Sequence, residues 1–265
     1  MDYNFEIKRL AGFLHYKIFS RHKRGHGIHS PFVFNLIRCA FNAKVPNEIM
    51  EKIEKSRKEL LKNDTIIPVS RFGAGSKVFK NKVKVKDLVR TVSVAPKYGR
   101  LLFNLVNYLK PSTVIELGTS IGIGTLYLGY GAGINPVISI EGDENVFKIA
   151  QKLVNNSGLS NVTLINDDFD RIFPRLIKNY SSDIFIFIDG NHNEEPLLKY
   201  MEQISLRFKD NAVIVIDDIY LNRSMERAWA KISKDEHFSI TIDLFKMGIA
   251  CIKQNISKQH FVIKM

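Results

Sequence analysis

Short apolar runs alternate with amphipathic stretches over most of the chain from residue 113 onward. The apolar runs have the length of buried strands, and the stretches between them repeat apolar residues at helical spacing. The predicted strands cover 113–117, 136–141, 161–166, 183–188 and 211–216, and the predicted helices cover 123–130, 143–156, 169–178, 193–208 and 221–233. This alternation favours an α/β fold with a doubly wound, Rossmann-like, mostly parallel sheet between two layers of helices.

The two ends of the chain follow other patterns. Three β segments at 237–245, 249–253 and 261–263 have no helix between them, which predicts an antiparallel C-terminal hairpin. Helical spacing over 3–20 and 47–61, and a helix start at Ser30-Pro31, predict a helical N-terminal part. The basic, glycine-bearing stretch 70–87 is interpreted as a connection. We therefore expect a basic, mainly helical extension or lid over 1–90 and a catalytic domain over 91–265.

A glycine-rich turn between the first predicted strand and helix is the main candidate for a ligand site. The strand ends at Glu116, and Gly118, Gly122 and Gly124 follow it. Glycine lets the backbone approach a ligand closely, and the helix N-terminus adds free N–H groups. An acidic residue, Glu141, ends the next strand, where it can accept hydrogen bonds from ribose hydroxyls. The pattern predicts a nucleotide-like ligand.

The spacing of the turn excludes two common nucleotide motifs. Gly-x-x-x-Gly-x-Gly is neither the dinucleotide pattern Gly-x-Gly-x-x-Gly nor the phosphate loop Gly-x-x-x-x-Gly-Lys-Ser/Thr. Glu116 would repel a pyrophosphate but suits a cationic amino-acid head group. S-adenosylmethionine carries an ammonium, a sulfonium and a ribose without phosphate, and is the predicted cofactor.

On the motif Glu-Leu-Gly-Thr-Ser-Ile-Gly at 116–122, the chain resembles the class I S-adenosylmethionine-dependent methyltransferases, in particular the small metal-dependent O-methyltransferases, from about residue 92 to 265. The sequence Gly-Ile-His-Ser-Pro-Phe-Val-Phe at 27–34 extends the likeness to a bacterial branch of that family. The resemblance implies that Glu116 lies near the methionine amine and Glu141 holds the ribose. The full set of implied cofactor-binding residues is Val94, Glu116, Gly118, Thr119, Ser120, Gly122, Gly124, Glu141, Gly142, Asp168, Phe169 and Asp189. Asp167 or Asp168 could instead cap the following helix.

Three carboxylates stand at the ends of neighbouring predicted strands. Asp189 follows the fourth strand, and Asp217 and Asp218 follow the fifth. Crowded carboxylates repel one another unless a cation neutralises them, and Mg²⁺ prefers oxygen ligands. The family resemblance also places metal ligands at these positions. We therefore expect a divalent metal, with Mg²⁺ as the first candidate.

His192 lies three residues after Asp189, in the motif Asp-Gly-Asn-His. A neutral hydroxyl is a poor nucleophile, and an imidazole can accept its proton near neutral pH. By resemblance, His192 is the catalytic base and Asp189 belongs to the same catalytic group. The alternative is a histidine that only packs locally or caps the helix after it.

The net charge of +12 is unevenly distributed. Residues 1–100 carry 22 Lys and Arg against 8 Asp and Glu, hence +14, whereas residues 101–265 carry 17 against 19, hence −2. The expected function is metal-assisted O-methylation of a hydroxyl on a small molecule. RNA bound through the basic N-terminal part is an alternative acceptor, which would make the protein a tRNA-modifying methyltransferase. A non-catalytic S-adenosylmethionine-binding module is a third candidate.

Other features of the sequence concern the expected cellular location and assembly of the protein. Two cysteines make no disulfide framework, and no apolar run has the length of a membrane span. The N-terminus lacks the apolar core of a signal peptide. These observations predict a cytoplasmic protein without an integral membrane segment. A homodimer is the remaining expected assembly.

Overall fold

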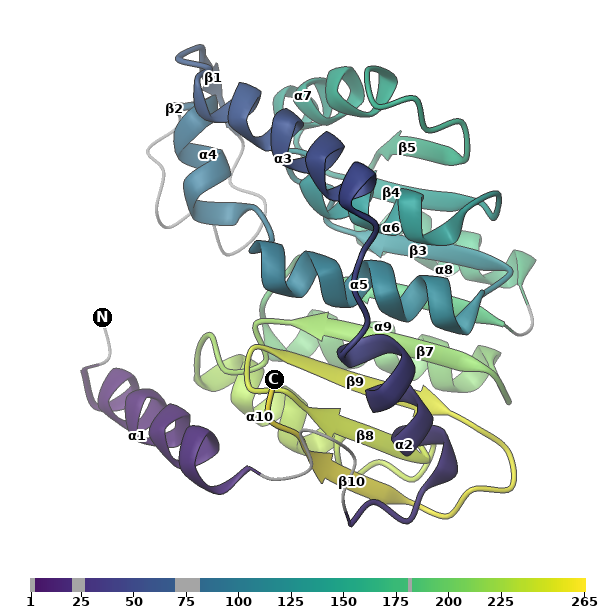
Figure 1. Ribbon diagram of the computed structural model, residues 1–265. Helices are drawn as coiled ribbons and strands as arrows, with labels where there is room; N and C mark the ends of the chain where they lie inside the picture. Colours follow the sequence, from purple (N-terminus) through teal and green to yellow (C-terminus); the bar gives the residue numbers. More distant parts are fainter. Residues whose placement is uncertain (1–2, 21–26, 70–81, 181–182) are drawn as a thin grey trace. The chain divides into compact units, whose positions relative to one another are not determined.

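A computed structural model describes residues 3–20, 27–69, 82–180 and 183–265 of the chain. The chain forms two compact units, one of residues 39–176 and one that joins residues 1–38 to residues 177–265 (Figure 1). The predicted boundary near residue 90 falls inside the first of these units. The division into an extension and a catalytic domain therefore stays a prediction.

The 39–176 unit contains a three-stranded parallel sheet in the order β3(Thr113–Leu117), β4(Val137–Glu141), β5(Val162–Asn166). Its helices are α3(Asn47–Leu61), α4(Val85–Val92), α5(Pro96–Leu109), α6(Ile123–Ala132), α7(Glu144–Asn155) and α8(Phe169–Leu176). A two-stranded antiparallel sheet of β1(Ile66–Pro68) and β2(Lys82–Lys84) precedes α4.

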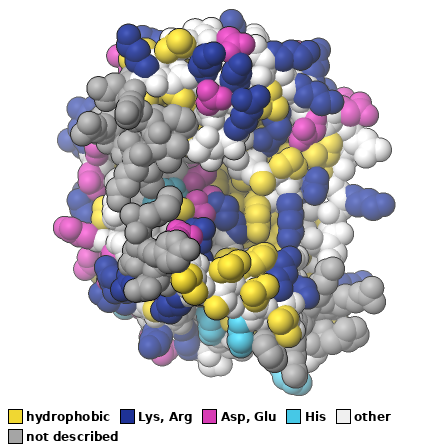
Figure 2. Space-filling view, turned by 90° about the vertical axis from the view of Figure 1, so that its left-hand side faces the viewer, with side chains coloured by type: hydrophobic (Ala, Val, Ile, Leu, Met, Phe, Trp, Pro, Cys, Tyr) yellow, Lys and Arg dark blue, Asp and Glu magenta, His cyan; other side chains and the backbone are white. Residues whose placement is uncertain are grey.

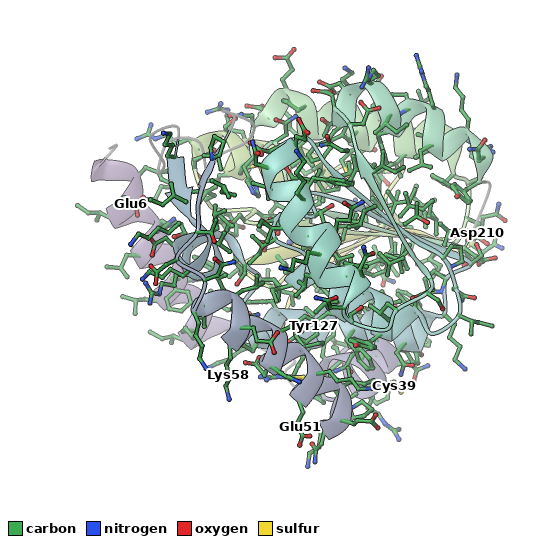
Figure 3. All side chains as sticks on the ribbon, turned by 90° about the horizontal axis from the view of Figure 1, so that it is seen from above. Glu6, Cys39, Glu51, Lys58, Tyr127 and Asp210 are labelled. Carbon is green, nitrogen blue, oxygen red and sulfur yellow. The ribbon has the colours of Figure 1, made fainter. Side chains whose placement is uncertain are left out.

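Local signals fix where these elements begin and end. Asp143 caps α7 by accepting hydrogen bonds from the N–H groups of Asn145 and Val146. Pro96 occupies the first turn of α5, and the helix ends where Lys110 takes a left-handed conformation before Pro111. Figure 3 shows Glu51 and Lys58 pointing outward from α3, whereas Tyr127 of α6 is completely buried. This alternation of polar and apolar faces is what the helical spacing predicts.

The second unit carries five strands in the order β10(Gln259–Val262), β8(Ile240–Asp243), β9(Met247–Ile252), β7(Ala212–Asp217), β6(Ile184–Ile188). Strands β6 and β7 are parallel, whereas β9 runs antiparallel to both β7 and β8. The unit also contains α1(Tyr3–Phe19), α2(Pro31–Leu36), the 3₁₀ turn Ile177–Asn179, α9(Glu194–Arg207) and α10(Arg223–Ile232), and a π-helical turn, Ile37–Phe41, follows α2. Every residue of β6 and β7 is buried, as continuous apolar runs predict for strands covered on both faces.

Two predictions about local structure need correction. The part of the 70–87 connection that the structure describes is not a loop, because Lys82–Lys84 is a strand and Val85–Val92 a helix; residues 70–81 lie outside the described ranges. The C-terminal hairpin of β8 and β9 is confirmed, but β10 then pairs with β8 in a parallel direction. Ser30 is confirmed as the cap of α2, since its hydroxyl accepts a hydrogen bond from Val33.

Candidate functional site

The turn between β3 and α6 has an unusual backbone. Gly118, Ser120 and Gly122 all have positive φ, at 108°, 50° and 89°. Left-handed geometry is natural for glycine but uncommon for serine, and such residues cluster at ligand sites. The N–H groups of Gly118 and Thr119 both donate to the Ile140 carbonyl at the end of β4. The turn is thereby tied to the neighbouring parallel strand.

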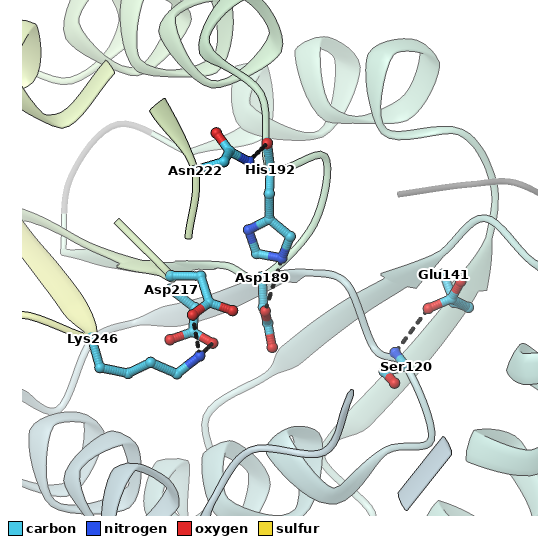
Figure 4. A network of polar contacts seen from close by, with 8 residues as sticks. Ser120, Glu141, Asp189, His192, Asp217, Asn222 and Lys246 are labelled. Carbon is cyan, nitrogen blue, oxygen red and sulfur yellow. Dashed lines mark hydrogen bonds and ion pairs between the residues drawn. The ribbon is translucent and has the colours of Figure 1, made fainter. Parts of the chain in front are cut away.

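Glu141 connects this turn to the next one. Its Oε2 accepts a hydrogen bond from the Ser120 N–H at 2.8 Å, and its Oε1 accepts one from the Asp143 N–H at 2.9 Å (Figure 4). Burial raises the pKa of Glu141, and the two backbone donors oppose that rise. The carboxylate stands at the carboxyl end of β4, where a doubly wound sheet binds ligands.

Glu116 is the most deeply buried acid of this unit, with 1% of its surface exposed. Its Oε2 accepts hydrogen bonds from Thr125 Oγ1 at 2.6 Å and Ser139 Oγ at 2.5 Å. Burial raises the pKa of Glu116 to about 7, although these two hydroxyl donors lower it. Glu116 therefore gains or loses a proton near neutral pH, and Thr125 and Ser139 are partners that no motif had identified.

The other implied cofactor residues of this unit have varied surroundings. The carbonyl of Val94 accepts a hydrogen bond from Arg57 Nη2 at 2.7 Å, and Gly124 lies in the first turn of α6. Asp168 accepts a hydrogen bond from the Asp170 N–H at 2.7 Å, just where Phe169 begins α8. Asp167 is instead paired with Arg171 at 2.6 Å. Of the two aspartates, Asp168 thus makes the cap-type contact to the start of the helix, and its cofactor role stays a prediction.

The second unit holds the expected catalytic residues after β6 and β7. His192 Nε2 lies 3.6 Å from Asp189 Oδ1, and both side chains are largely buried (Figure 4). Burial lowers the pKa of His192; Asp218 opposes this shift and Lys246 reinforces it. The imidazole is thus neutral at pH 7 and able to accept a proton.

Asn222 positions the loop that carries His192. Its Nδ2 donates to the His192 carbonyl at 3.1 Å, while its Oδ1 caps α10 by accepting from the Met225 N–H. Asn191 stands in the left-handed region and its Nδ2 donates to the Tyr200 hydroxyl. The histidine is therefore held by two neighbouring elements rather than by its own helix cap.

Asp217 and Asp218 share a lysine that sequence reasoning missed. Lys246 Nζ lies 3.0 Å from Asp217 Oδ2 and 2.5 Å from Asp218 Oδ1. Burial alone would lower the pKa of Lys246, but the two carboxylates raise it above its usual value. Burial raises the pKa of Asp217 to about 6 even though Lys246 opposes the rise. The pairing of Asp217 with Met247 across β7 and β9 is what brings Lys246 to the carboxylates.

A divalent cation would need ligands that this cluster offers only in part. Asp217 Oδ1 is buried and has no hydrogen-bond partner among the described residues, so one carboxylate oxygen is a possible ligand. Within the described ranges, however, no group of three or more His, Cys, Asp or Glu side chains is arranged to hold a metal ion. The described residues thus do not form a ready-made metal centre, and Lys246 already supplies positive charge to two of the three expected ligands.

Comparisons with known proteins agree with this description. Residues 115–219 match a family model described as a methyltransferase domain. A catechol O-methyltransferase of Niastella koreensis is 27% identical over 131 residues, which are 48% of this chain and 58% of that protein. The chain thus spans little more than half the length of that curated relative.

Solved methyltransferase structures share the fold. An SAH-bound methyltransferase of Podospora anserina is 15% identical, with a TM-score of 0.57 over 82% of this chain and 93% of its own. An O-methyltransferase of Bacillus cereus in complex with SAH is 17% identical, with a TM-score of 0.53 over 79% and 91%. The expected resemblance to class I methyltransferases and the Rossmann-like fold are confirmed by these matches.

In the described part of the chain, no helix is both long and apolar enough to cross a membrane.

Proposed function

We propose that this chain, which carries a class I methyltransferase domain, is an S-adenosylmethionine-dependent O-methyltransferase that acts on a hydroxyl of a small molecule. The observation that carries the proposal is the turn between β3 and α6. Its three left-handed residues and the hydrogen bond from Ser120 to Glu141 form a compact cradle beside one carboxylate. Such a cradle at the carboxyl ends of parallel strands suits a ribose and an amino-acid head group.

The charge of this cradle supports a cationic cofactor. Glu116 and Glu141 form no ion pair with any residue that the structure describes. Uncompensated buried carboxylates are costly unless a cation joins them or they take up protons. S-adenosylmethionine brings an ammonium and a sulfonium, whereas a pyrophosphate would add negative charge.

The residues after β6 supply a proton acceptor. In the proposed reaction the acceptor oxygen attacks the methyl carbon, the carbon–sulfur bond breaks, and the electron pair remains on sulfur as a thioether. The hydroxyl proton passes to the neutral His192 imidazole. Asp189, 3.6 Å from His192, then faces the imidazolium and favours its charge. The proposal therefore gives both residues the catalytic roles that the sequence motif predicts.

Positive charge near the acceptor is proposed to come from Lys246. Its ammonium contacts both Asp217 and Asp218, the residues expected to bind a metal. The divalent metal stays a prediction. A chelator distinguishes a metal from Lys246 as the source of positive charge, because turnover that survives chelation favours Lys246.

Cofactor binding and methyl transfer to a panel of phenols and catechols test the proposal together. A catechol is the first acceptor to test, because the curated relative is named for that substrate. Glu141→Ala should weaken S-adenosylhomocysteine binding at least tenfold in calorimetry, since charged hydrogen bonds contribute about 1.5–3 kcal/mol each. Glu144→Ala is the matched control, because Glu144 begins the adjoining helix with an exposed side chain. Equal affinities of the two variants would contradict the proposed pocket.

The same experiment separates the proposal from its alternatives. Cofactor binding without transfer to any acceptor would indicate a non-catalytic binding module. RNA as acceptor and a homodimer stay predictions of the sequence, to be tested by tRNA methylation and by light scattering.

A further inference from the structure

We propose that a groove between α1 and the loops after β7 and β8 binds the body of the acceptor, and that this acceptor is an uncharged aromatic compound. The inference rests on the proposed function and adds the substrate class. The groove belongs to the unit of residues 1–38 and 177–265, and the argument concerns only residues described in that unit.

Helix α1 is fastened to this unit at two points along its length. Tyr16 Oη donates to the Ile263 carbonyl at 2.7 Å and accepts from the Met265 N–H at 3.0 Å. Lys8 Nζ lies 2.8 Å from Glu226 Oε1 on α10. The helix is therefore a defined wall of the unit, although several of its apolar side chains remain exposed.

That wall faces the Lys246–Asp218 pair. The groove has a volume of about 550 Å³; α1 lines it with Ile7, Leu10 and Phe13, and Asp218, Tyr220 and Lys246 lie opposite. Small-molecule sites commonly enclose about 300–1,000 Å³. Ile7 is 57% and Leu10 61% exposed. Exposed apolar side chains beside a lysine–carboxylate cluster are what an apolar acceptor with one polar end would cover.

Three of the residues that line the groove are aromatic. Phe245 lies 5.1 Å from Phe13 and 5.2 Å from Tyr220, measured between ring centroids. Both distances suit tilted aromatic pairs, and Phe13 keeps 37% of its surface exposed. The single O–H donor of Tyr220 is already used, since it donates to Asp243 Oδ2 at 2.6 Å. The rings thus offer apolar faces rather than free polar groups, which favours an aromatic ligand.

The charges around the groove cancel in pairs. Arg9 Nη2 is 3.0 Å from Glu6 Oε2, and Lys246 is bound by Asp218 and Asp217. An anionic acceptor would find no uncompensated cation among the described lining residues, and would lie close to two carboxylates. Figure 2 shows hydrophobic side chains beside both basic and acidic side chains on the face that bears α1. Charge balance therefore favours an uncharged acceptor.

A larger cavity beneath α1 gives room for a substituent. Its volume is about 890 Å³, and it shares Arg9, Tyr220 and Phe245 with the groove. Gly12 lies in its lining, and among the described residues a Cβ at that position would come within 4 Å of Phe245 alone, at 3.8 Å. An acceptor with an apolar substituent can thus extend from the groove along Phe245 into this cavity.

A matched pair of acceptors tests the inference: a catechol that bears a carboxylate, and the butyl ester of the same compound. We expect kcat/KM for the ester to exceed that for the carboxylate by at least tenfold. Phe13→Ala should lower kcat/KM for the ester about tenfold, mainly through KM, since truncation of a large aromatic contact costs about 1.4 kcal/mol or more. Leu14→Ala is the control, because Leu14 is 53% exposed on the same helix and lines neither groove nor cavity.

Gly12→Leu and Gly12→Ala probe the cavity. The methyl ester of the same compound serves as a third, shorter acceptor. Leucine fills more of the cavity than alanine, so Gly12→Leu should reduce turnover of the butyl ester more than Gly12→Ala does, and more than it reduces turnover of the methyl ester. Preference for the carboxylate, or equal effects of Phe13→Ala and Leu14→Ala, would overturn the inference. If no acceptor is methylated, the proposed function fails, and calorimetric binding of the ester still decides the groove. Binding weakened by Phe13→Ala supports it, and absence of binding overturns it.

Discussion

Glu116 allows a quantitative test of the buried cofactor turn. Substitution Glu116→Gln keeps the size of the side chain and its capacity to accept hydrogen bonds from Thr125 and Ser139, but removes the titration. The pKa of Glu116 in the folded protein is about 7, against 4.5 for the ordinary side chain, and burial is the largest cause. Because the folded state binds this proton more tightly than the unfolded state, protonation stabilises the fold.

The sign and size of the effect follow from linkage. The stabilising contribution is complete below pH 4.5, decreases as pH rises, and is lost above pH 7. At about 1.4 kcal/mol for each pKa unit, the full loss is about 3 kcal/mol. Between pH 5 and pH 8 the free energy of unfolding of the wild type should fall by about 2–3 kcal/mol relative to Glu116→Gln.

Urea unfolding at pH 5, 6, 7 and 8, without cofactor, measures this difference. Comparison with Glu116→Gln at each pH cancels the contributions of other titrating groups. S-adenosylmethionine should shift the wild-type transition more at pH 8 than at pH 6, because a cationic ligand favours the ionised carboxylate. Parallel stability curves for the two proteins would refute the reasoning, since Glu116 would then titrate alike in the folded and unfolded states.

Three further predictions concern the other sites. His192→Gln should lower kcat at least a hundredfold with little change in cofactor affinity, and loss of cofactor affinity would indicate a structural role. Because burial lowers the pKa of His192, the acidic limb of the wild-type pH profile of kcat should lie below pH 6.5. Lys246→Met should lower the free energy of unfolding by about 1–3 kcal/mol, which is less than the cost of breaking a fully buried ion pair because Lys246 is a third exposed. Mg²⁺ should raise the melting temperature of this variant but not that of the wild type. Gly131→Ala should lower the free energy of unfolding, measured by thermal denaturation, by about 1–3 kcal/mol, because the new Cβ would lie 2.8 Å from the Phe103 carbonyl oxygen of α5. Gly133→Ala is the control, because its Cβ meets no described atom within 4 Å and the substitution strains only the positive φ.

The sheet could be predicted because its strands are continuous apolar runs. β3, β4 and β6 lie within a residue of their predicted bounds, and α3 begins and ends at the predicted residues. The lysines of the segment Lys82–Lys84 favour a connection. Its alternation of lysine and valine, with Val83 buried, was nevertheless a strand signal that composition concealed. The direction of β10 could not be predicted, since apolar spacing identifies a strand but not its partner.

The candidate site likewise contains residues that the sequence could predict and residues that it could not. Asp189, His192, Asp217 and Asp218 could be found because each follows a predicted strand. Lys246 could not, because its contact with Asp217 spans 29 positions of sequence and depends on the register between β7 and β9. Asn222 was missed for the same reason, since its contact with the His192 carbonyl joins two loops. Residues that act through another residue have no local motif, so their positions follow only from tertiary pairing.

The treatment of charge differs between the two units. In the 39–176 unit, hydroxyl and backbone donors contact the buried acids Glu116 and Glu141, and no described residue forms an ion pair with either acid. A cationic ligand therefore gains from both. In the other unit Lys246 already compensates Asp217 and Asp218. An added cation has less to gain there, and an anion would lie close to two carboxylates. Charge alone therefore assigns the cationic cofactor to the first unit and an uncharged acceptor to the second, independently of the family resemblance.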